Sequence, residues 1–324
     1  MEDPPIPVQS EEDTQQTDIV TSLQVDRLDA NLFRSKDLKT PFLARGVFGG
    51  QVISQALVSA TQCVQPEYLL HSLHCYFLLS ASASIPILYY VDNLRNGRSY
   101  VTRSVRAVQN GRAVFVLLCS FQIPEPSQPM QQWPMPSALS PERSIPEEDF
   151  IRSLMQKPGI SEAKKAWYLG HIEQRESSPV EVRLPLVHIE ATGKPEIKYW
   201  MKTRERCDYG PSFQKSILAY ISDLHFLNAA TLSVGLRRKA GASTMVSTLD
   251  HSISYYSHDF NCSEWMLYVI ESPAVGSGRG YVRGRMYSRE GELLAVMTQE
   301  GVMRAHRDVR PVASVAEDST KAKL

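Results

Sequence analysis

Two segments of the chain carry apolar residues at the three- and four-residue spacing of an amphipathic helix. In the first, which follows the glycine pair Gly49-Gly50, the apolar positions are Val52, Ile53, Ala56, Leu57 and Ala60. In the second, which Pro211 opens, they are Ile217, Leu218, Ile221, Leu224 and Leu227. Glycine punctuates a helix boundary, and proline is tolerated in the first turn. The pattern predicts one amphipathic helix in each half, the second of which includes Asp223.

Each predicted helix is followed by short apolar segments typical of strands. The expected strands of the first half are residues 71–79, 85–91, 100–108 and 113–122, and those of the second are 247–256, 265–271, 280–287 and 293–302. Asn110-Gly111 is a strong signal for a two-residue hairpin turn. A helix that buries one face against antiparallel strands predicts an α+β unit in which a curved sheet wraps the helix.

A short sequence near the middle of the first half returns in the second. Asn96-Gly97-Arg98-Ser99-Tyr100-Val101 recurs as Ser277-Gly278-Arg279-Gly280-Tyr281-Val282. Each copy leads into an extended stretch and a turn that contains Gly111 or Gly291. The repeat indicates one folding unit, duplicated and fused, with sheet edges that can pair and so protect each other. Because one working active site is sufficient, chemistry is expected where the copies differ.

Composition sets the expected domain boundaries. Residues 1–21, rich in acid, proline, serine and glutamine, are expected to form a disordered tail, and 307–324 a second tail. Residues 22–123 and 180–306 are the two units, the second carrying the catalytic residues. Between them, residues 124–179 are expected to be a proline-rich linker and connecting segment on the surface, because repeated proline excludes helix interiors and central strands. Trp133 is expected to pin this linker without much contribution to the core.

Charge and cysteine content exclude several classes of function. The 35 basic and 35 acidic residues balance, which gives no electrostatic basis for binding nucleic acid or an anionic membrane. The longest apolar run, residues 113–121, is too short for a membrane span of about 20 residues. No signal peptide is visible, and the 5 cysteines form no metal-like or CxxC spacing. We expect a soluble protein of a reducing compartment that needs no cofactor.

Three polar residues of the second half stand in apolar surroundings that the first half does not repeat. Asp223 has mostly apolar neighbours on a helical wheel, which would raise its pKa by desolvation. Thr248 begins a strand and offers a hydroxyl, and Gln299 offers an amide that both donates and accepts where spacing in the first copy puts Cys119. Each residue also has an interpretation without a catalytic role. Asp223 could lie at an exposed helix edge, Thr248 could be a β-branched strand residue, and Gln299 could face solvent from a strand.

Other chemistries find little support in the sequence. His71 and His74, or Asp250 and His251, could suggest a metal site, but ligation needs three or four convergent donors. Histidines with a structural role on strands are the favoured interpretation. There is no Gly-x-Ser-x-Gly elbow of a serine hydrolase and no phosphate-binding glycine loop.

Six short motifs, taken in order, resemble the type II acyl-CoA thioesterase family. In the first half they are Arg45-Gly46-Val47-Phe48-Gly49-Gly50-Gln51-Val52, followed by Gln55-Ala56-Leu57, and His71-Ser72-Leu73-His74-Cys75-Tyr76-Phe77. In the second half they are Ser222-Asp223-Leu224, Thr248-Leu249-Asp250-His251-Ser252 and Thr298-Gln299-Glu300-Gly301-Val302-Met303. The resemblance covers about residues 22–304. It implies a double hot-dog fold and hydrolysis of acyl-CoA to fatty acid and CoA.

The resemblance also implies site residues, partners and a location. The family's catalytic aspartate, hydroxyl residue and glutamine fall on Asp223, Thr248 and Gln299, which would hold one water. Arg279 and Arg283 are candidates for contact with the CoA phosphates. The final Ala322-Lys323-Leu324 resembles the Ser-Lys-Leu signal that peroxisomal import receptors bind. We therefore expect the peroxisomal matrix, with the cytoplasm as the alternative, and self-association of the fused chain into a homo-oligomer.

Two other functions stay open on the residues alone. Hot-dog folds also host enoyl-CoA hydratases, which would need a histidine beside the acid. His225 is only two residues from Asp223, but side chains two positions apart on a helix point in different directions. The other alternative is a catalytically inactive module that binds acyl-CoA, against which the intact trio argues. Release of free CoA thiol would separate the three.

Overall fold

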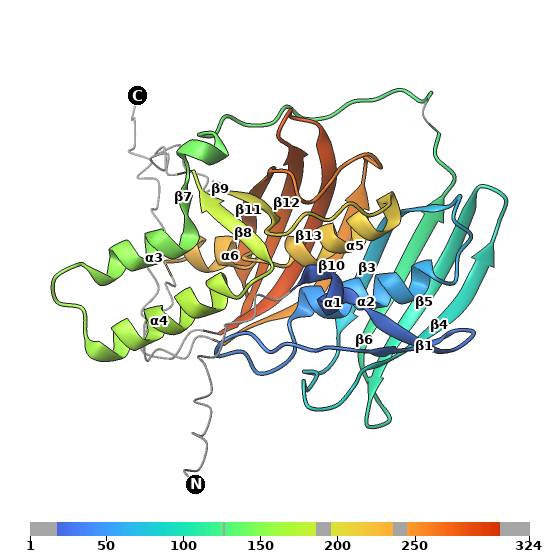
Figure 1. Ribbon diagram of the computed structural model, residues 1–324, viewed down its shortest axis with the longest axis horizontal. Coiled ribbons are helices and arrows are strands. Elements are labelled where there is room, and N and C mark those ends of the chain that lie inside the picture. The colour runs from blue at the N-terminus through green and yellow to red at the C-terminus, as the bar shows by residue number, and fades with distance from the viewer. Residues whose placement is uncertain (1–17, 126, 186–195, 236–244, 305–324) are drawn as a thin grey trace, which may run out of the picture.

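The computed structural model describes residues 18–125, 127–185, 196–235 and 245–304 (Figure 1). Within them one antiparallel sheet runs through the molecule in the strand order β1-β2-β4-β5-β6-β3-β10-β13-β12-β11-β9-β8-β7. Strands β1 to β6 are Val25–Asp29, Leu32–Ser35, Leu69–Phe77, Leu88–Asn96, Tyr100–Gln109 and Arg112–Gln122. Strands β7 to β13 are Ile145–Pro146, Val180–Leu184, Glu196–Thr203, Met245–Tyr255, Met266–Gly276, Arg279–Ser288 and Leu293–Arg304. Residues 1–17 of the expected N-terminal tail and all of the expected C-terminal tail, with Ala322-Lys323-Leu324, lie outside the described residues.

The sheet repeats one topology on either side of its centre. The order β4-β5-β6-β3 of the first half returns as β11-β12-β13-β10 in the second. The two sets meet edge to edge where β3 pairs antiparallel with β10, with Leu73 opposite Ile253. The duplication and the joined sheet edges expected from the sequence repeat are thus observed. The α+β class is confirmed.

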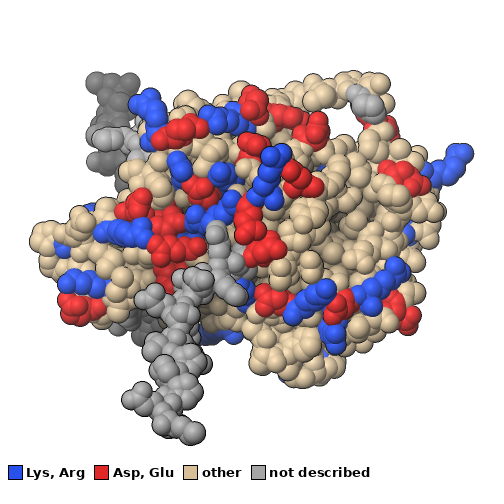
Figure 2. Space-filling model, in the orientation of Figure 1, with Lys and Arg blue, Asp and Glu red and all other residues tan. Residues whose placement is uncertain are grey.

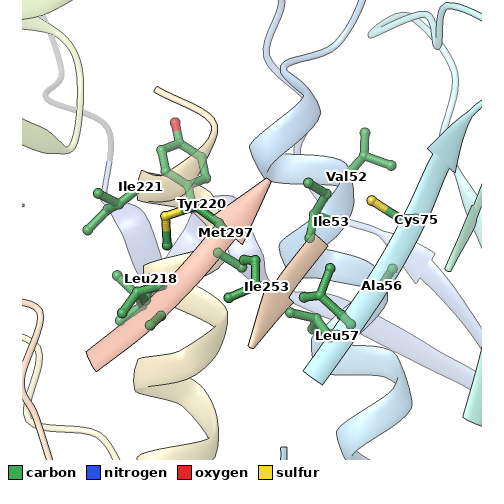
Figure 3. Close-up of a cluster of buried hydrophobic side chains, with 14 of the residues drawn as sticks. Val52, Ile53, Ala56, Leu57, Cys75, Leu218, Tyr220, Ile221, Ile253 and Met297 are labelled. Carbon is green, nitrogen blue, oxygen red and sulfur yellow. The ribbon is translucent and has the colours of Figure 1, made fainter. Parts of the chain in front are cut away.

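One central helix from each half lies against the sheet. Helix α2 is Gly49–Thr61 and helix α5 is Pro211–Ser222. The two helices pack side by side in opposite directions, and the Ser54 hydroxyl donates to the Ser216 carbonyl at 2.8 Å. Their apolar faces point toward Cys75, Ile253 and Met297 on the central strands (Figure 3). Because the helices are antiparallel, the start of α2 meets the end of α5.

Helix α5 ends earlier than its apolar pattern predicts. Its last residue is Ser222, and Asp223 is the C-cap rather than an interior residue. Two residues later His225 has φ of 61°, a left-handed conformation that stops an α-helix. Leu224 still packs against the core from the turn. The expectation that the helix continues through Asp223 is therefore wrong, and the difference places this carboxylate at a helix end.

The connecting segment between the units is more structured than expected. It contains helix α3, Glu147–Met155, and helix α4, Glu162–Glu176, which form a hairpin beside the second half (Figure 1). Its proline-rich part covers a second apolar cluster: Met135 and Ala138 pack against the cluster made by Trp200, Trp265, Leu267, Val269 and Tyr287. The linker therefore contributes to a core, contrary to expectation.

The linker is attached through Gln132 more than through Trp133. The Gln132 side chain donates to the Gly291 carbonyl at 2.7 Å and accepts from the Leu293 N–H at 2.9 Å. Trp133 itself is half exposed, with the Arg285 guanidinium 5.1 Å from the centre of its ring. Helix α1, Ile19–Leu23, packs on the core, so the last residues of the segment expected to be a tail are part of the fold.

Two absences among the described residues concern membrane spans and metal sites. None of the helices there is long and apolar enough to cross a membrane. No group of three or more histidine, cysteine, aspartate or glutamate side chains in these segments could hold a metal ion. The face drawn in Figure 2 carries basic and acidic side chains intermixed rather than a continuous basic surface.

Candidate active site

The structure brings together the three side chains singled out in the second half. The Gln299 amide nitrogen donates to the Asp223 carboxylate at 3.1 Å and to the Thr248 hydroxyl at 2.5 Å. Asp223 comes from the end of α5, Thr248 from β10 and Gln299 from β13. Gln299 is only 1% exposed, whereas Asp223 and Thr248 keep partial exposure. The site therefore has a buried amide behind an acid and a hydroxyl that solvent can reach.

An irregularity in β10 gives Thr248 its direction. The pairing of β10 with β13 shifts between Thr248 and Asp250, so that Leu249 is an extra residue in the strand. Successive residues of a regular strand point to opposite faces, and one extra residue changes the facing of those before it. Thr248 and His251, three positions apart, both contact the side chain of Gln299. The bulge thus adds a second polar contact to Gln299.

His251 extends this polar cluster into the core. Its ring is 1% exposed, with Nδ1 3.0 Å from the Gln299 amide oxygen and Nε2 3.0 Å from the Ser222 hydroxyl. The edge of the ring packs against Phe226. Burial lowers the pKa of His251 to about 4, so the ring is neutral at neutral pH. The sequence alone suggests His251 only as a metal ligand or a structural residue, not as a neighbour of Gln299.

Asp223 is a carboxylate poised between its charged and neutral forms. Burial raises its pKa from 3.8 to about 7, against the opposing effect of hydrogen bonds from the Gln299 amide and the Gly50 backbone N–H. Asp223 caps the C-terminus of α5, whose dipole disfavours a negative charge, but it faces the N-terminus of α2, whose dipole favours one. An acid with this pKa suits proton transfer near neutral pH.

Close packing of the two helix ends requires the glycine pair. A Cβ atom on Gly49 would lie 2.7 Å from the Asp223 carboxylate and 3.1 Å from the Phe77 ring. A Cβ atom on Gly50 would lie 2.6 Å from the Tyr220 carbonyl of α5. Glycine at both positions therefore lets the start of α2 approach the acid and donate a backbone N–H to it.

The titratable groups whose pKa the charge of Asp223 raises further are neutral at neutral pH. Burial raises the pKa of Cys75, Tyr220 and Tyr268 above their ordinary values. The Tyr268 hydroxyl donates to the Ser222 carbonyl at 2.7 Å, one residue before the acid. The cluster therefore consists of one ionisable carboxylate among neutral donors and acceptors.

A second network holds the turn that follows Asp223. His225 Nε2 lies 2.9 Å from the Glu147 carboxylate, and the Asn228 amide lies 3.2 Å from His225 Nδ1. Tyr199 stacks on the ring, and Arg175 lies 3.0 Å from Glu147. Both nitrogens of His225 are thus engaged away from Asp223, as the argument against a hydratase dyad expected.

The candidate phosphate-binding arginines are already paired with acids. Arg279 donates to Glu300 at 2.8 Å, and Arg283 donates to Glu271 at 2.8 Å, both on the exposed side of the second half.

The first unit has no carboxylate at the end of its helix to match Asp223. There the C-cap of α2, which corresponds to Asp223, is Gln62. The asymmetry between the copies is thus an acid in one and an amide in the other.

Comparisons with known proteins identify the family of the chain. The acyl-CoA thioesterase N-terminal domain family matches residues 39–122, and the acyl-CoA thioesterase C-terminal domain family matches residues 146–303. The chain belongs to the acyl-CoA thioesterase family. The resemblance seen in the sequence motifs is confirmed, and so is its class, an enzyme that hydrolyses thioesters.

Individual relatives cover nearly the whole chain. It is 37% identical over 292 residues to acyl-coenzyme A thioesterase 8 of Rattus norvegicus, with 89% of each chain covered. It is 23% identical over 316 residues to peroxisomal acyl-coenzyme A thioester hydrolase 1 of Saccharomyces cerevisiae, which covers 83% of this chain and 90% of the yeast protein.

Solved structures support the fold. The crystal structure of the acyl-CoA thioesterase II TesB2 from Mycobacterium marinum superposes with a TM-score of 0.70 at 30% identity, covering 90% of this chain and 99% of that one. A hot-dog protein of unknown function from Alicyclobacillus acidocaldarius superposes with a TM-score of 0.66 at 18% identity, covering 88% and 97%. The double hot-dog fold is therefore confirmed.

Proposed function

We propose that this chain hydrolyses acyl-CoA thioesters to a free fatty acid and CoA, using one water activated by Asp223. The observation that carries the proposal is the shared contact of Gln299 with both Asp223 and Thr248. A buried amide that joins a high-pKa acid to a hydroxyl fits general base catalysis better than metal or covalent chemistry.

Each of the three side chains has a distinct part in the proposed reaction. Asp223 in its charged form accepts a proton from the water as the water oxygen attacks the thioester carbonyl carbon. Both hydrogens of the Gln299 amide are directed at Asp223 and Thr248. The Thr248 oxygen thus accepts from the amide and keeps its own hydrogen to orient the water. Gln299 would act by holding these two partners at the correct separation.

The start of α2 completes the proposed site. As the carbonyl becomes tetrahedral, its oxygen gains negative charge, which the N-terminal dipole of the 13-residue helix α2 would stabilise. The C–S bond then breaks, and the proton taken up by Asp223 passes to the leaving sulfur. The steps balance to water plus thioester giving acid plus thiol. No covalent enzyme intermediate is required.

The proposed chemistry is tested by measuring release of free thiol from acyl-CoA. Asp223→Asn is expected to fold and to lower kcat by on the order of 100-fold or more, the scale of general base catalysis. Asp208→Asn, at an exposed acid paired with Arg206, is the matched control and should keep full activity. Near-normal turnover by a folded Asp223→Asn protein would remove Asp223 from the mechanism.

Thr248 allows a sharper test of the hydroxyl. Thr248→Ser keeps an oxygen that can accept from Gln299 and is expected to retain most activity. Thr248→Val has nearly the same shape but leaves the amide without that acceptor. If the valine variant matched the serine variant, the hydroxyl would have no part in turnover.

We also propose import into peroxisomes through Ala322-Lys323-Leu324, which lies outside the described residues. The supporting observations are the likeness of this tripeptide to a known import signal and the peroxisomal name of the yeast relative. A fluorescent protein that carries the last residues of the chain should enter peroxisomes, and deletion of the tripeptide should leave it in the cytoplasm. Self-association stays a prediction, which the mass of the purified protein in solution would test.

A further inference from the structure

Gln299 can work only with its amide turned in one direction. A charged carboxylate accepts hydrogen bonds and cannot donate them, so the amide nitrogen must face Asp223. The amide oxygen then faces Nδ1 of His251 at 3.0 Å. Thr248 does not choose between the two directions, because a hydroxyl can both donate and accept.

His251 is the neighbour whose hydrogen fits this direction. A carbonyl oxygen can only accept, so Nδ1 of His251 carries a hydrogen that it donates to Gln299. The ring is buried and neutral, which leaves Nε2 without a hydrogen and able to accept from the Ser222 hydroxyl at 3.0 Å. A continuous chain of donors therefore runs from Ser222 through His251 and Gln299 to Asp223.

The same atoms permit the reverse chain. The Ser222 hydroxyl also lies 2.8 Å from the Ala219 carbonyl, to which it can donate. His251 would then donate from Nε2 to Ser222, and Gln299 would turn its oxygen toward Asp223. That arrangement brings the Gln299 amide oxygen against the Asp223 carboxylate and disfavours its charged form. A hydrogen on Nδ1 of His251 thus accompanies a charged Asp223, and a hydrogen on Nε2 a neutral one.

We propose that His251 is a positioning residue, which fixes the Gln299 amide by donating from Nδ1 and thereby supports the charged form of Asp223. The inference rests on the proposed function, because it assigns His251 a role that acts through Gln299. Burial makes this role effective, since hydrogen bonds in a chain strengthen one another where water is excluded. His251 touches neither the water nor the thioester in this scheme.

Two substitutions separate positioning from packing. His251→Leu removes the donor but keeps an apolar side chain in the core. His251→Asn places an amide nitrogen close to the position of Nδ1 and can still donate to Gln299. His71→Leu is the matched control, because His71 is a half-buried strand histidine of the first unit that bonds the Ser120 hydroxyl at 2.8 Å.

The measurement is the dependence of kcat and KM on pH, with thermal melting as the test of folding. His251→Leu should raise the pH at which activity appears. A rise of about one unit in the Asp223 pKa would lower kcat at pH 7 about fivefold and at pH 5 to 6 close to tenfold. KM should change little. His251→Asn should return the profile toward that of the wild type, and His71→Leu should leave the profile unchanged.

A double variant tests whether His251 acts through Gln299. If it does, adding His251→Leu to Gln299→Ala should cost no further activity, because the partner is already absent. Losses that multiply, or equal profiles for the leucine and asparagine variants, would overturn the positioning role. ¹⁵N NMR of the histidine rings would independently report the hydrogen on Nδ1, and a hydrogen on Nε2 at pH 8 would contradict it.

Failure of this inference can be told apart from failure of the proposed function. If Asp223→Asn and Gln299→Ala lose activity while His251→Leu does not, only the role of His251 is wrong. If Asp223→Asn and Gln299→Ala both keep full activity, the proposed catalytic site itself is wrong.

Discussion

Glu147, at the start of helix α3, holds His225, the residue two positions beyond Asp223, at a distance of 2.9 Å. His225 occupies a left-handed conformation with φ of 61°, which an ordinary side chain adopts at a cost. The Glu147 carboxylate, the Asn228 amide and the stacked Tyr199 ring together hold the His225 side chain in place. The connecting segment thus holds in place the turn at the end of α5, next to the candidate acid Asp223.

Glu147→Gln is expected to loosen this turn and lower both stability and turnover. The wild-type carboxylate is 14% exposed and faces Arg175, which is 6% exposed, so removing its charge leaves a buried cation without a full partner. Breaking such a pair costs on the order of 3 kcal/mol. Chemical denaturation and kcat should both report the loss. Glu162→Gln, at an exposed pair on α4, is the control and should change neither.

The stability lost in Glu147→Gln should depend on pH in one direction. Burial alone would raise the pKa of Glu147, but His225 and Arg175 outweigh burial and hold it at about 2, below the ordinary 4.5. A carboxylate whose pKa is lower in the folded than in the unfolded protein stabilises the fold at pH above its unfolded pKa. This stabilisation is lost as pH falls toward the folded pKa. The stability gap between wild type and Glu147→Gln should therefore be present at pH 5 and narrow as pH falls below about 4.5 toward 2. A gap that widened below pH 4 would contradict the assignment.

Turnover should rise with pH through the neutral range. Because the pKa of Asp223 is raised to about 7, half of the chains hold a protonated, inactive acid near that pH. We expect kcat/KM to increase about tenfold per pH unit below pH 7 and to level off above it. An unchanged rate between pH 5 and pH 8 would mean that the acid titrates lower or takes no part.

The sequence was most informative where local rules and tertiary structure agree. Pro211 starts its helix as expected, and Asn110-Gly111 forms the turn between β5 and β6 with positive φ at both residues. The end of α5 was predicted incorrectly because Leu224 and Leu227 continue the helical spacing after the backbone has left the helix. His225, which leaves the helical conformation there, is held by Glu147 and Tyr199 from distant segments, which local spacing does not reveal.

The candidate site shows the same division. Asp223, Thr248 and Gln299 could be selected from the sequence through the family resemblance, and the structure brings them into contact. His251 was not selected, because the inward direction of both Thr248 and His251 depends on the extra residue Leu249. Such a bulge arises from pairing with β13, where Asp250 and its partner Glu300 are 50 residues apart, and leaves no local signal. Glu147 was missed because it directly follows the proline-rich part of the linker.

Gly49→Ala should damage the site without unfolding the protein. The added Cβ would lie 2.7 Å from the Asp223 carboxylate, closer than real Cβ atoms approach, so the acid or the start of α2 must shift. A misplacement of this size in a catalytic group can cost on the order of 100-fold in rate. Gly276→Ala is the matched control, since its Cβ would meet nothing within 4 Å. Equal kcat for the two variants would show that the close approach of Gly49 to Asp223 is not needed.

Asp223→Asn should be more stable than the wild type at high pH even as it loses activity. The pKa of Asp223 is higher in the folded protein than the 3.8 of the unfolded chain. The acid therefore adds most to the free energy of unfolding below pH 3.8, and this contribution is lost as pH rises through about 7. A shift of that size corresponds to at most about 4 kcal/mol. Asparagine has no charge to desolvate, so its melting temperature should exceed that of the wild type at pH 8, and the difference should shrink toward pH 5. A variant that melts lower at pH 8 would mean that the charged acid is stabilised by its donors more than burial opposes it.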